Sequence, residues 1–233
     1  QRKQLDLLLN LNEVHKQKRQ AEGDLEARIN SFELAYRMQT DAREAFDIAG
    51  EKPETVAKYG ANAQGRQMLI ARRLLERGVR FVQVRQGGWD LHGGIAQRAA
   101  NNARQLDPAI GAIMDDLKDR GLFEDTLIYI TSEFGRSPTE DGGGGRSHNA
   151  RGLSTVLMGG GIKGGIAYGS TDEIGGAAVE NKVHVKDIHA TVMDLLGFDH
   201  EQLTYRTAGR DFRLTQATRS LPQGGMPVKG IIA

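Results

Sequence analysis

Asp90 and His92 are residues whose types and spacing could do chemistry. They lie in the stretch GGWDLHGG, residues 87 to 94, between two glycine pairs and shortly after the apolar run VRFVQV. A carboxylate and an imidazole one residue apart offer an oxygen and a nitrogen to a divalent metal ion. Asp and Gly are also common turn residues, so a loop that binds nothing is the alternative interpretation.

Two more polar stretches contain residues that could bind the same ion. Glu133 directly follows the apolar run TLIYITS, and His148 lies in the glycine-rich stretch GGGGRSHN. Ligands of parallel α/β sheets collect at the carboxyl ends of the strands, so we expect Asp90, His92, Glu133 and His148 to form one metal site. Zn, Ca, Mn and Mg all accept such mixed ligands, and His148 alone is more often a surface-loop histidine.

Arg136 and Arg146 are candidates for binding an anion near this ion. A guanidinium group forms paired hydrogen bonds to phosphate or sulfate. Their alternative roles are to neutralise Glu140 and Asp141, or to form a buried ion pair with Glu133.

The remaining histidines and the glycine-rich stretches receive no chemical role. Asp187 and His189 repeat the Asp-x-His pattern, but at the start of an amphipathic helix, where capping and packing explain them. DGGGG and GGGIKGG lack the Walker pattern and are interpreted as turns, with ligand closure as a minority option. No chemistry is assigned to His15, His184 and His200.

The composition limits the class of protein. Among 233 residues, 31 Lys and Arg nearly balance 30 Asp and Glu, so binding to nucleic acid is not expected. No cysteine is present, which leaves His, Asp and Glu as the metal ligands. The sequence has no apolar run of about 18 residues, so we predict no transmembrane helix.

Helical and extended patterns alternate from residue 64 onward. Helices are predicted over 64–78, around 106–117 and over 186–197, with Gly78, Gly121 and Gly197 as their ends and Asp187 as a cap. The apolar runs 79–86, 126–132 and 153–160 predict strands. This alternation indicates the α/β class with parallel strands.

Three segments are expected along the chain. Residues 1–60 form a helical lead-in, with two amphipathic helices broken near Gly23 and Asp24 as an N-cap. Residues 61–220 form the α/β domain, and residues 221–233 form a tail. Three strands are fewer than the usual sheet of about 4 to 6, so we expect the chain to be the C-terminal portion of a larger domain.

The motifs of the chain together resemble a known family. ARRLLERGVRFVQV, GWDLH, DDLKDRGLFEDTLIYITSEFGRSP, GRSHN, MGGGIKGGIAYGSTDEIG and VHVKDIHATVMDLLGFDHEQLTYRTAGRDFRLT resemble the sulfatase-like family of domain of unknown function 1501, in the alkaline phosphatase superfamily. The resemblance runs from about residue 24 to about residue 215 and is specific in order and spacing.

The resemblance implies an alkaline phosphatase-like fold with a partial parallel-sheet core and divalent ions beside the sheet. TSEFGR is similar to the superfamily element Ser/Ala-Asp-His/Asn-Gly, which places Glu133 as an acidic ligand and Phe134 where a second ligand often stands. His148 is similar to the distal histidine ligand, and Asp90 and His92 to the earlier Asp/His pair, although their spacing is shorter than Asp-x-x-x-His.

The same resemblance implies features that this chain does not display. The superfamily nucleophile, a Ser, Thr or formylglycine near the N-terminus of the full domain, has no match in this chain. Family members are typically longer and carry a twin-arginine signal, which implies a periplasmic or exported protein.

The first hypothesis is a metal-dependent hydrolase of small-molecule or glycan sulfate or phosphate esters, in which Arg136 or Arg146 holds the anion. The alternative is a non-catalytic, degenerate sulfatase-like module that binds metal or a sulfated glycan, favoured by Phe134 and the missing nucleophile. A phosphomutase-like transferase is a third, weaker hypothesis.

Overall fold

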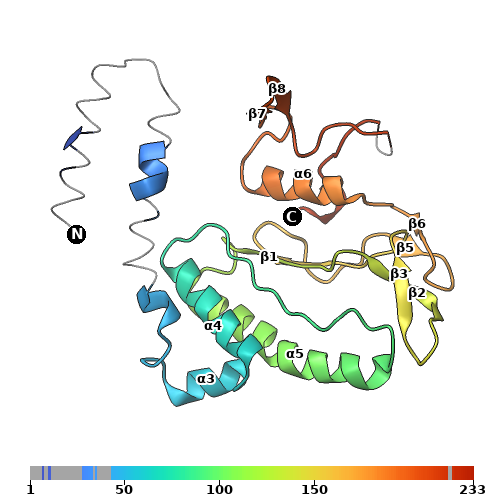
Figure 1. Cartoon of the computed structure of the whole chain (residues 1–233), viewed down its shortest axis with the longest axis horizontal. Coiled ribbons are helices and arrows are strands. Elements are labelled where there is room, and N and C mark those ends of the chain that lie inside the picture. Colours follow the sequence, from blue (N-terminus) through green and yellow to red (C-terminus); the bar gives the residue numbers. More distant parts are fainter. Residues whose placement is uncertain (1–6, 8–9, 12–27, 34, 36–42, 220–221) are drawn as a thin grey trace. The chain divides into compact units, whose positions relative to one another are not determined.

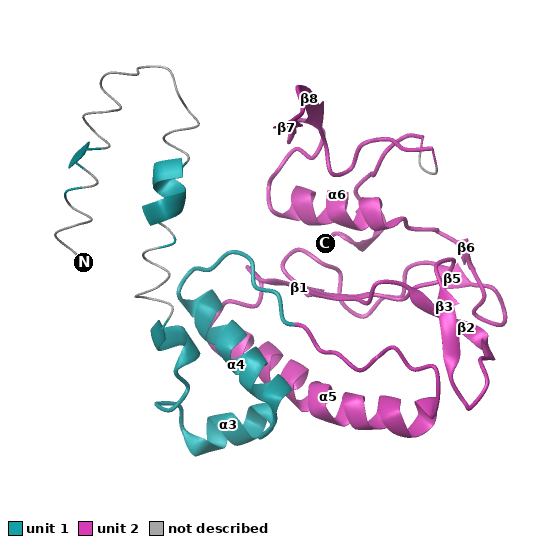
Figure 2. Ribbon diagram, viewed as in Figure 1, with its two compact units in different colours: residues 1–84 teal, residues 85–233 magenta. Residues whose placement is uncertain are grey.

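A computed structural model of the chain describes residues 7, 10–11, 28–33, 35, 43–219 and 222–233 (Figure 1). The chain divides into two compact units, residues 1–84 and 85–233 (Figure 2). The division falls after residue 84, whereas the sequence predicted a boundary after residue 60. The helix at 63–76 packs against the helix before it, which explains the later boundary.

Unit 1 contains the helices α3 (Pro53–Tyr59) and α4 (Ala63–Glu76), and residues 28–33 and 43–46 are also helical. The predicted helix break at Gly23 and the Asp24 cap lie outside the described residues. Tyr59 and Leu69 are fully buried. A side chain at Gly65 would meet the carbonyl oxygen of Tyr59 at 2.3 Å, so glycine permits the tight turn from α3 into α4.

A part-buried ion-pair network centred on Arg72 holds α4 to the segment before α3. Arg72 is 4% exposed, and its guanidinium lies 2.8 Å from Glu51 and 2.7 Å from Glu76. Arg73 also binds Glu51 and donates a hydrogen bond to the carbonyl of Ala45 at 3.0 Å. Burial raises the pKa of Glu51, but the hydrogen bonds from Arg73 and Arg72 outweigh it and leave that pKa below its ordinary value.

The helices of unit 2 are the long α5 (Ile95–Asp119) and the shorter α6 (Val185–Leu195). The sequence predicted the C-terminal ends of α4, α5 and α6, and the glycine that follows each cap has a positive φ, as expected for such an end. None of the helices among the described residues is both long and apolar enough to cross a membrane.

The tail packs against the rest of unit 2. It contains a short 3-10 helix, Lys229–Ile231. The amide of Val228 donates to the Thr191 hydroxyl on α6 at 2.9 Å, and Thr191 is fully buried. An antiparallel bridge joins Ile162 to Ile232.

The strands of unit 2 form antiparallel pairs rather than the predicted parallel sheet. The pairs are β1 (Leu127–Ile130) with β4 (Val156–Gly159), β2 (Gly135–Glu140) with β3 (Arg146–Asn149), β5 (Ser170–Thr171) with β6 (Ala178–Glu180), and β7 (Tyr205–Thr207) with β8 (Arg210–Phe212). Parallel neighbours need a long crossover, usually a helix. No helix lies between β1 and β4, where the chain runs out through the β2–β3 hairpin and returns. The described residues contain no parallel sheet, and an alkaline phosphatase-like parallel-sheet core stays a prediction.

The predicted strand over residues 79–86 is not formed. Its residues have no regular secondary structure and no strand partner among the described residues, although the side chains from Phe81 to Gln86 alternate between exposed and half-buried. Phe81 is 82% exposed. Alternation is a local property of the sequence, whereas a strand needs a second segment to bond with.

The ion-pair network of unit 1 gives a first prediction. Replacing Glu51→Gln removes a negative partner of the buried Arg72, so we expect the opening free energy of α4 amides in hydrogen exchange to fall by about 2 kcal/mol. This is below the about 3–5 kcal/mol of a fully buried pair, because Glu76 still binds Arg72. Because the folded pKa of Glu51 is lowered, this contribution exists above the unfolded pKa and is lost as pH falls through the folded pKa.

Glu54→Gln is the matched control, because Glu54 is an exposed glutamate in the first turn of α3. An equal effect of both substitutions would contradict a specific role for the Arg72 network.

Candidate metal site

The loop before α5 presents Asp90 and His92 on the same side. Both side chains are exposed, whereas Leu91 between them is 2% exposed and anchors the loop in unit 2. Asn102 on α5 donates a hydrogen bond to the carbonyl of Gly88 at 2.7 Å and fixes the start of the loop. The one-residue spacing therefore places both candidate ligands outward.

The β2–β3 hairpin supplies the other side of the site. Arg136 on β2 lies directly opposite His148 on β3 in the antiparallel register. Side chains of such a pair stand on the same face of the hairpin. Both side chains reach Asp90, as described below.

Backbone hydrogen bonds join the loop to the hairpin. The amide of Arg146 donates to the carbonyl of Leu91 at 3.0 Å, and the amide of Gly94 donates to the carbonyl of Gly143 at 2.9 Å. A side chain at Gly145 would lie 2.0 Å from the carbonyl carbon of His92, so the two segments approach as closely as backbone allows. We call these contacts the loop–hairpin clamp.

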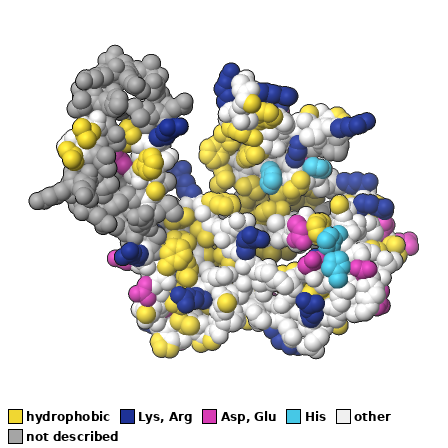
Figure 3. All heavy atoms as spheres, viewed as in Figure 1, with side chains coloured by type: hydrophobic (Ala, Val, Ile, Leu, Met, Phe, Trp, Pro, Cys, Tyr) yellow, Lys and Arg dark blue, Asp and Glu magenta, His cyan; other side chains and the backbone are white. Residues whose placement is uncertain are grey.

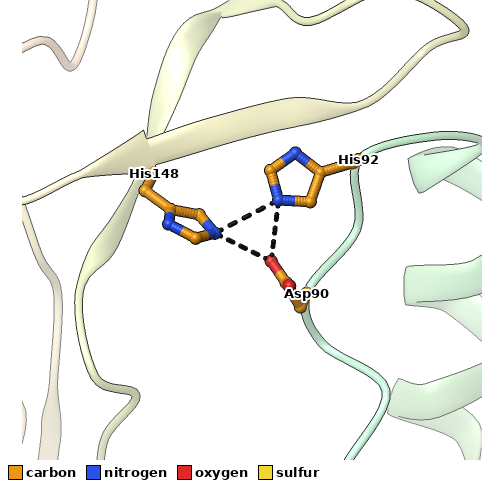
Figure 4. Close-up of side chains that lie close together, drawn as sticks. All are labelled: Asp90, His92 and His148. Atoms are coloured by element: carbon orange, nitrogen blue, oxygen red, sulfur yellow. Dashed lines mark hydrogen bonds and ion pairs between the residues drawn. The ribbon is translucent and has the colours of Figure 1, made fainter.

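The clamp brings three potential ligand atoms together, as Figure 4 shows. Oδ1 of Asp90 lies 3.0 Å from Nε2 of His92 and 3.0 Å from Nε2 of His148, and the two nitrogens lie 3.1 Å apart. The three residues form the only metal-ligand group of this kind found in the described part of the chain. Figure 3 shows histidine and acidic side chains gathered at the surface in this region.

Asp141 orients one of these ligands. Nδ1 of His92 donates to Oδ2 of Asp141 at 2.9 Å, so the neutral ring carries its proton on Nδ1 and presents a lone pair at Nε2. A carboxylate behind a ligating histidine is a common feature of metal sites. The same hydrogen bond raises the pKa of His92 and lowers the pKa of Asp141.

Arg136 binds the carboxylate at the centre of the group. Its Nη1 donates to Oδ1 of Asp90 at 2.7 Å, and its Nη2 lies 3.7 Å from Oε1 of Glu133. The hydrogen bonds from Arg136 and then from His148 lower the pKa of Asp90 to about 2. Asp90 is therefore an anion at any pH at which a metal ion would bind.

The spacing of the three atoms fits a small divalent ion. Bonds of about 2.0–2.1 Å in tetrahedral or octahedral geometry place neighbouring ligand atoms about 2.9–3.4 Å apart. Ca²⁺, with bonds of about 2.3–2.6 Å and a preference for oxygen, fits less well. When both Nε2 atoms are unprotonated, three acceptor atoms face one another, and a cation between them removes their repulsion.

Two of the expected site residues lie beside this group and not in it. Glu133 is exposed and contacts Arg136, and the half-buried Arg146 donates from its guanidinium to the carbonyl of Gly145 at 3.1 Å. Phe134 packs on His148 with ring centroids 4.2 Å apart. The assignment of Glu133 as a metal ligand and of Arg146 as an anion-binding group stays a prediction.

The sequence missed Asp141 as a functional residue. It was considered as a charge partner of arginine, whereas it hydrogen-bonds His92, 49 positions away. A carboxylate seven residues before His148, at the opposite end of a glycine turn, was the only available signal. Glu140 was expected to pair with arginine too, but its Oε1 accepts from the amide of Gly144 at 2.8 Å and closes that turn.

The other histidines in the described residues lie outside the ligand group, and two of them have structural contacts. His184 caps α6, where its Nδ1 accepts from the Lys186 amide at 3.2 Å and Asp187 accepts from the His184 amide at 2.7 Å. His189 is exposed on α6, and His200 binds the Thr215 hydroxyl. Asp187 takes part in capping as expected, but from the third helical position, because the N-cap itself is His184. His15 lies outside the described residues.

The fold and the site define a protein of helices and antiparallel strand pairs. It carries an exposed group of one Asp and two His side chains whose ligand atoms are spaced as in a metal site. A family model described as "Protein of unknown function (DUF1501)" matches residues 1–223, so the chain belongs to the DUF1501 family. Comparison with curated proteins and with solved structures finds no match.

The pairing of His92 with Asp141 predicts an unusual titration. We expect the metal-free protein to show a ring pKa for His92 above the ordinary value of about 6.5. Asp141→Asn removes the carboxylate that stabilises the imidazolium, so the pKa should fall toward that value. NMR titration of the ring Cε1 protons checks both statements, and an unchanged His92 in the variant would contradict the pairing.

The clamp predicts that Gly145→Ala separates the ligands. An added methyl group would overlap the His92 carbonyl, so the loop and hairpin must move apart. Gly87→Ala is the matched control in the same loop, because a side chain there meets nothing within 4 Å. We expect loss of NMR contacts between the rings of His92 and His148 only in Gly145→Ala. Retained contacts would show that the clamp does not position the rings.

Proposed function

We propose that the chain binds a divalent metal ion through Asp90, His92 and His148 and acts as a metal-dependent hydrolase of sulfate or phosphate esters. The observation that carries the proposal is the triangle of ligand atoms with sides of 3.0, 3.0 and 3.1 Å, held by the clamp and oriented by Asp141. Two imidazoles favour Zn or Mn over Ca or Mg.

The exposure of the three residues supports a reactive rather than a structural ion. Their side chains are 46–61% exposed, which leaves room for water or substrate beside the ligands. Structural zinc sites have four protein ligands, whereas catalytic sites have three and an open position. When bound, such an ion polarises the ester and lowers the pKa of an attacking hydroxyl or water.

The residues of the chain would contribute binding and orientation. Asp141 holds the His92 ring with its lone pair toward the ligand group. Arg136 and Arg146 supply positive charge for the anionic ester, and the guanidinium of Arg136 already lies against Asp90. The link to the alkaline phosphatase superfamily and an exported location belong to the same proposal, since they rest on resemblance.

A non-catalytic module is the second candidate. Phe134 occupies the position where the resemblance places a second ligand, and its ring packs on one side of His148. A single ion with no attacking group nearby would bind a sulfated glycan or serve as structure.

Metal content tests the ligand assignment. We expect near-stoichiometric Zn or Mn in protein purified without chelator, measured by inductively coupled plasma mass spectrometry, and at least about a tenfold loss in each of the alanine variants of Asp90, His92 and His148. His189→Ala is the matched control, because this histidine is exposed on α6. Equal trace metal in all folded variants would contradict the site, and iron would favour a facial-triad oxygenase instead.

Activity separates the two candidates. Because the superfamily nucleophile has no match in this chain, the attacking group would have to be water activated by the metal. If that water attacks, we expect the metal-loaded chain to hydrolyse p-nitrophenyl sulfate or phosphate, with loss of turnover on chelation and in His92→Ala. Metal-loaded protein that hydrolyses neither ester but binds a sulfated oligosaccharide would support the non-catalytic module.

A further inference from the structure

Arg136 and a metal ion would compete for the same atom. Oδ1 of Asp90 accepts from Nη1 of Arg136 at 2.7 Å and is the oxygen that lies 3.0 Å from both histidine nitrogens. The side chain of Arg136 is 22% exposed, and its other nitrogen faces Glu133. In the metal-free site the guanidinium therefore supplies the positive charge that an ion would otherwise supply.

An ion at the triangle changes the partners of Arg136. A divalent cation within bonding distance of Asp90 repels the guanidinium and takes the charge of the carboxylate, and both effects weaken the Arg136–Asp90 hydrogen bond. The guanidinium then keeps only weak acceptors. Glu133 reaches it at 3.7 Å, which is beyond a hydrogen bond, and the carbonyl of Arg146 accepts from Nη1 at 3.5 Å, the outer limit of one.

Other contacts would keep the released guanidinium beside the ion. The ring of Phe134 lies 5.4 Å from the guanidinium carbon of Arg136 and also packs on His148. Cation–π stacking holds arginine in place while its N–H groups remain available. Arg136 also starts from β2, directly opposite His148, so it has little freedom to leave the site.

We propose that Arg136 is an anion-binding residue released by the metal, so that a divalent ion and a tetrahedral oxyanion such as sulfate bind this site cooperatively. The inference rests on the proposed metal site and deepens it. Phe134 gains a role as the platform for Arg136, in the position where the resemblance places a second ligand.

Calorimetric titration of the whole chain with Zn²⁺ or Mn²⁺ tests the proposal. Because Arg136 competes with the ion, we expect Arg136→Gln to bind metal about fivefold more tightly than the parent. Sulfate at constant ionic strength, compared with chloride, should tighten metal binding to the parent by about fivefold or more, which is the lower end of usual coupling between sites. The variant should lose that enhancement.

Two controls define the effect. Arg151→Gln removes one exposed arginine beyond β3 and should behave as the parent does. Phe134→Leu keeps an apolar side chain but removes the aromatic face, so it should bind metal and show a reduced sulfate effect.

The outcomes separate the two proposals. No metal binding to the parent would overturn both. The inference would be overturned if Arg136→Gln weakened metal binding, or if sulfate did not tighten metal binding to the parent. The metal site would then remain, with Arg136 as an orienting partner of Asp90. Equal effects in Arg151→Gln would show that net charge alone is responsible.

Discussion

The site depends on the close backbone approach between the Asp90–His92 loop and the glycine turn of the hairpin. Asp90 and His148 are 58 positions apart, and ordering a loop of that length has an entropic cost. The clamp brings the two segments together through main-chain hydrogen bonds, which do not depend on the ligands. The ligand atoms can therefore lie close together before any cation binds them, and less ordering is left for the binding step.

Glycine at position 145 is the residue that makes this approach possible. Any side chain there would overlap the carbonyl of His92, whereas the neighbouring Gly142, Gly143 and Gly144 serve the turn through positive φ angles. The stretch GGGG thus combines two separate requirements, one conformational and one steric. The first was inferred from the sequence, but the second could not be, because it depends on a segment about 50 residues away.

The same distinction explains which parts of the structure the sequence predicted. Helix ends at Gly78, Gly121 and Gly197 follow from local periodicity and a positive φ, and they were found. The sequence also singled out Asp90, His92 and His148 by residue type and by the glycines around them, and the structure brings these three side chains together. Residue type alone does not encode long-range pairing. Long-range pairing determines the direction of β4 against β1, the lack of a partner for segment 79–86, and the partners of Asp141 and Arg136.

The stretch GGWDLHGG can be a turn and a ligand loop at the same time, so the two interpretations do not compete. The glycines let the chain leave residue 88 with a φ of 87° and enter α5 through Gly94, and the buried Leu91 fixes which side chains point outward. A turn of this kind determines where Asp90 and His92 lie, and the hairpin determines what they meet. The chemistry follows from this arrangement, because a carboxylate whose pKa is about 2 and two imidazoles about 3 Å away form a set of atoms that protons, a guanidinium or a metal ion can stabilise.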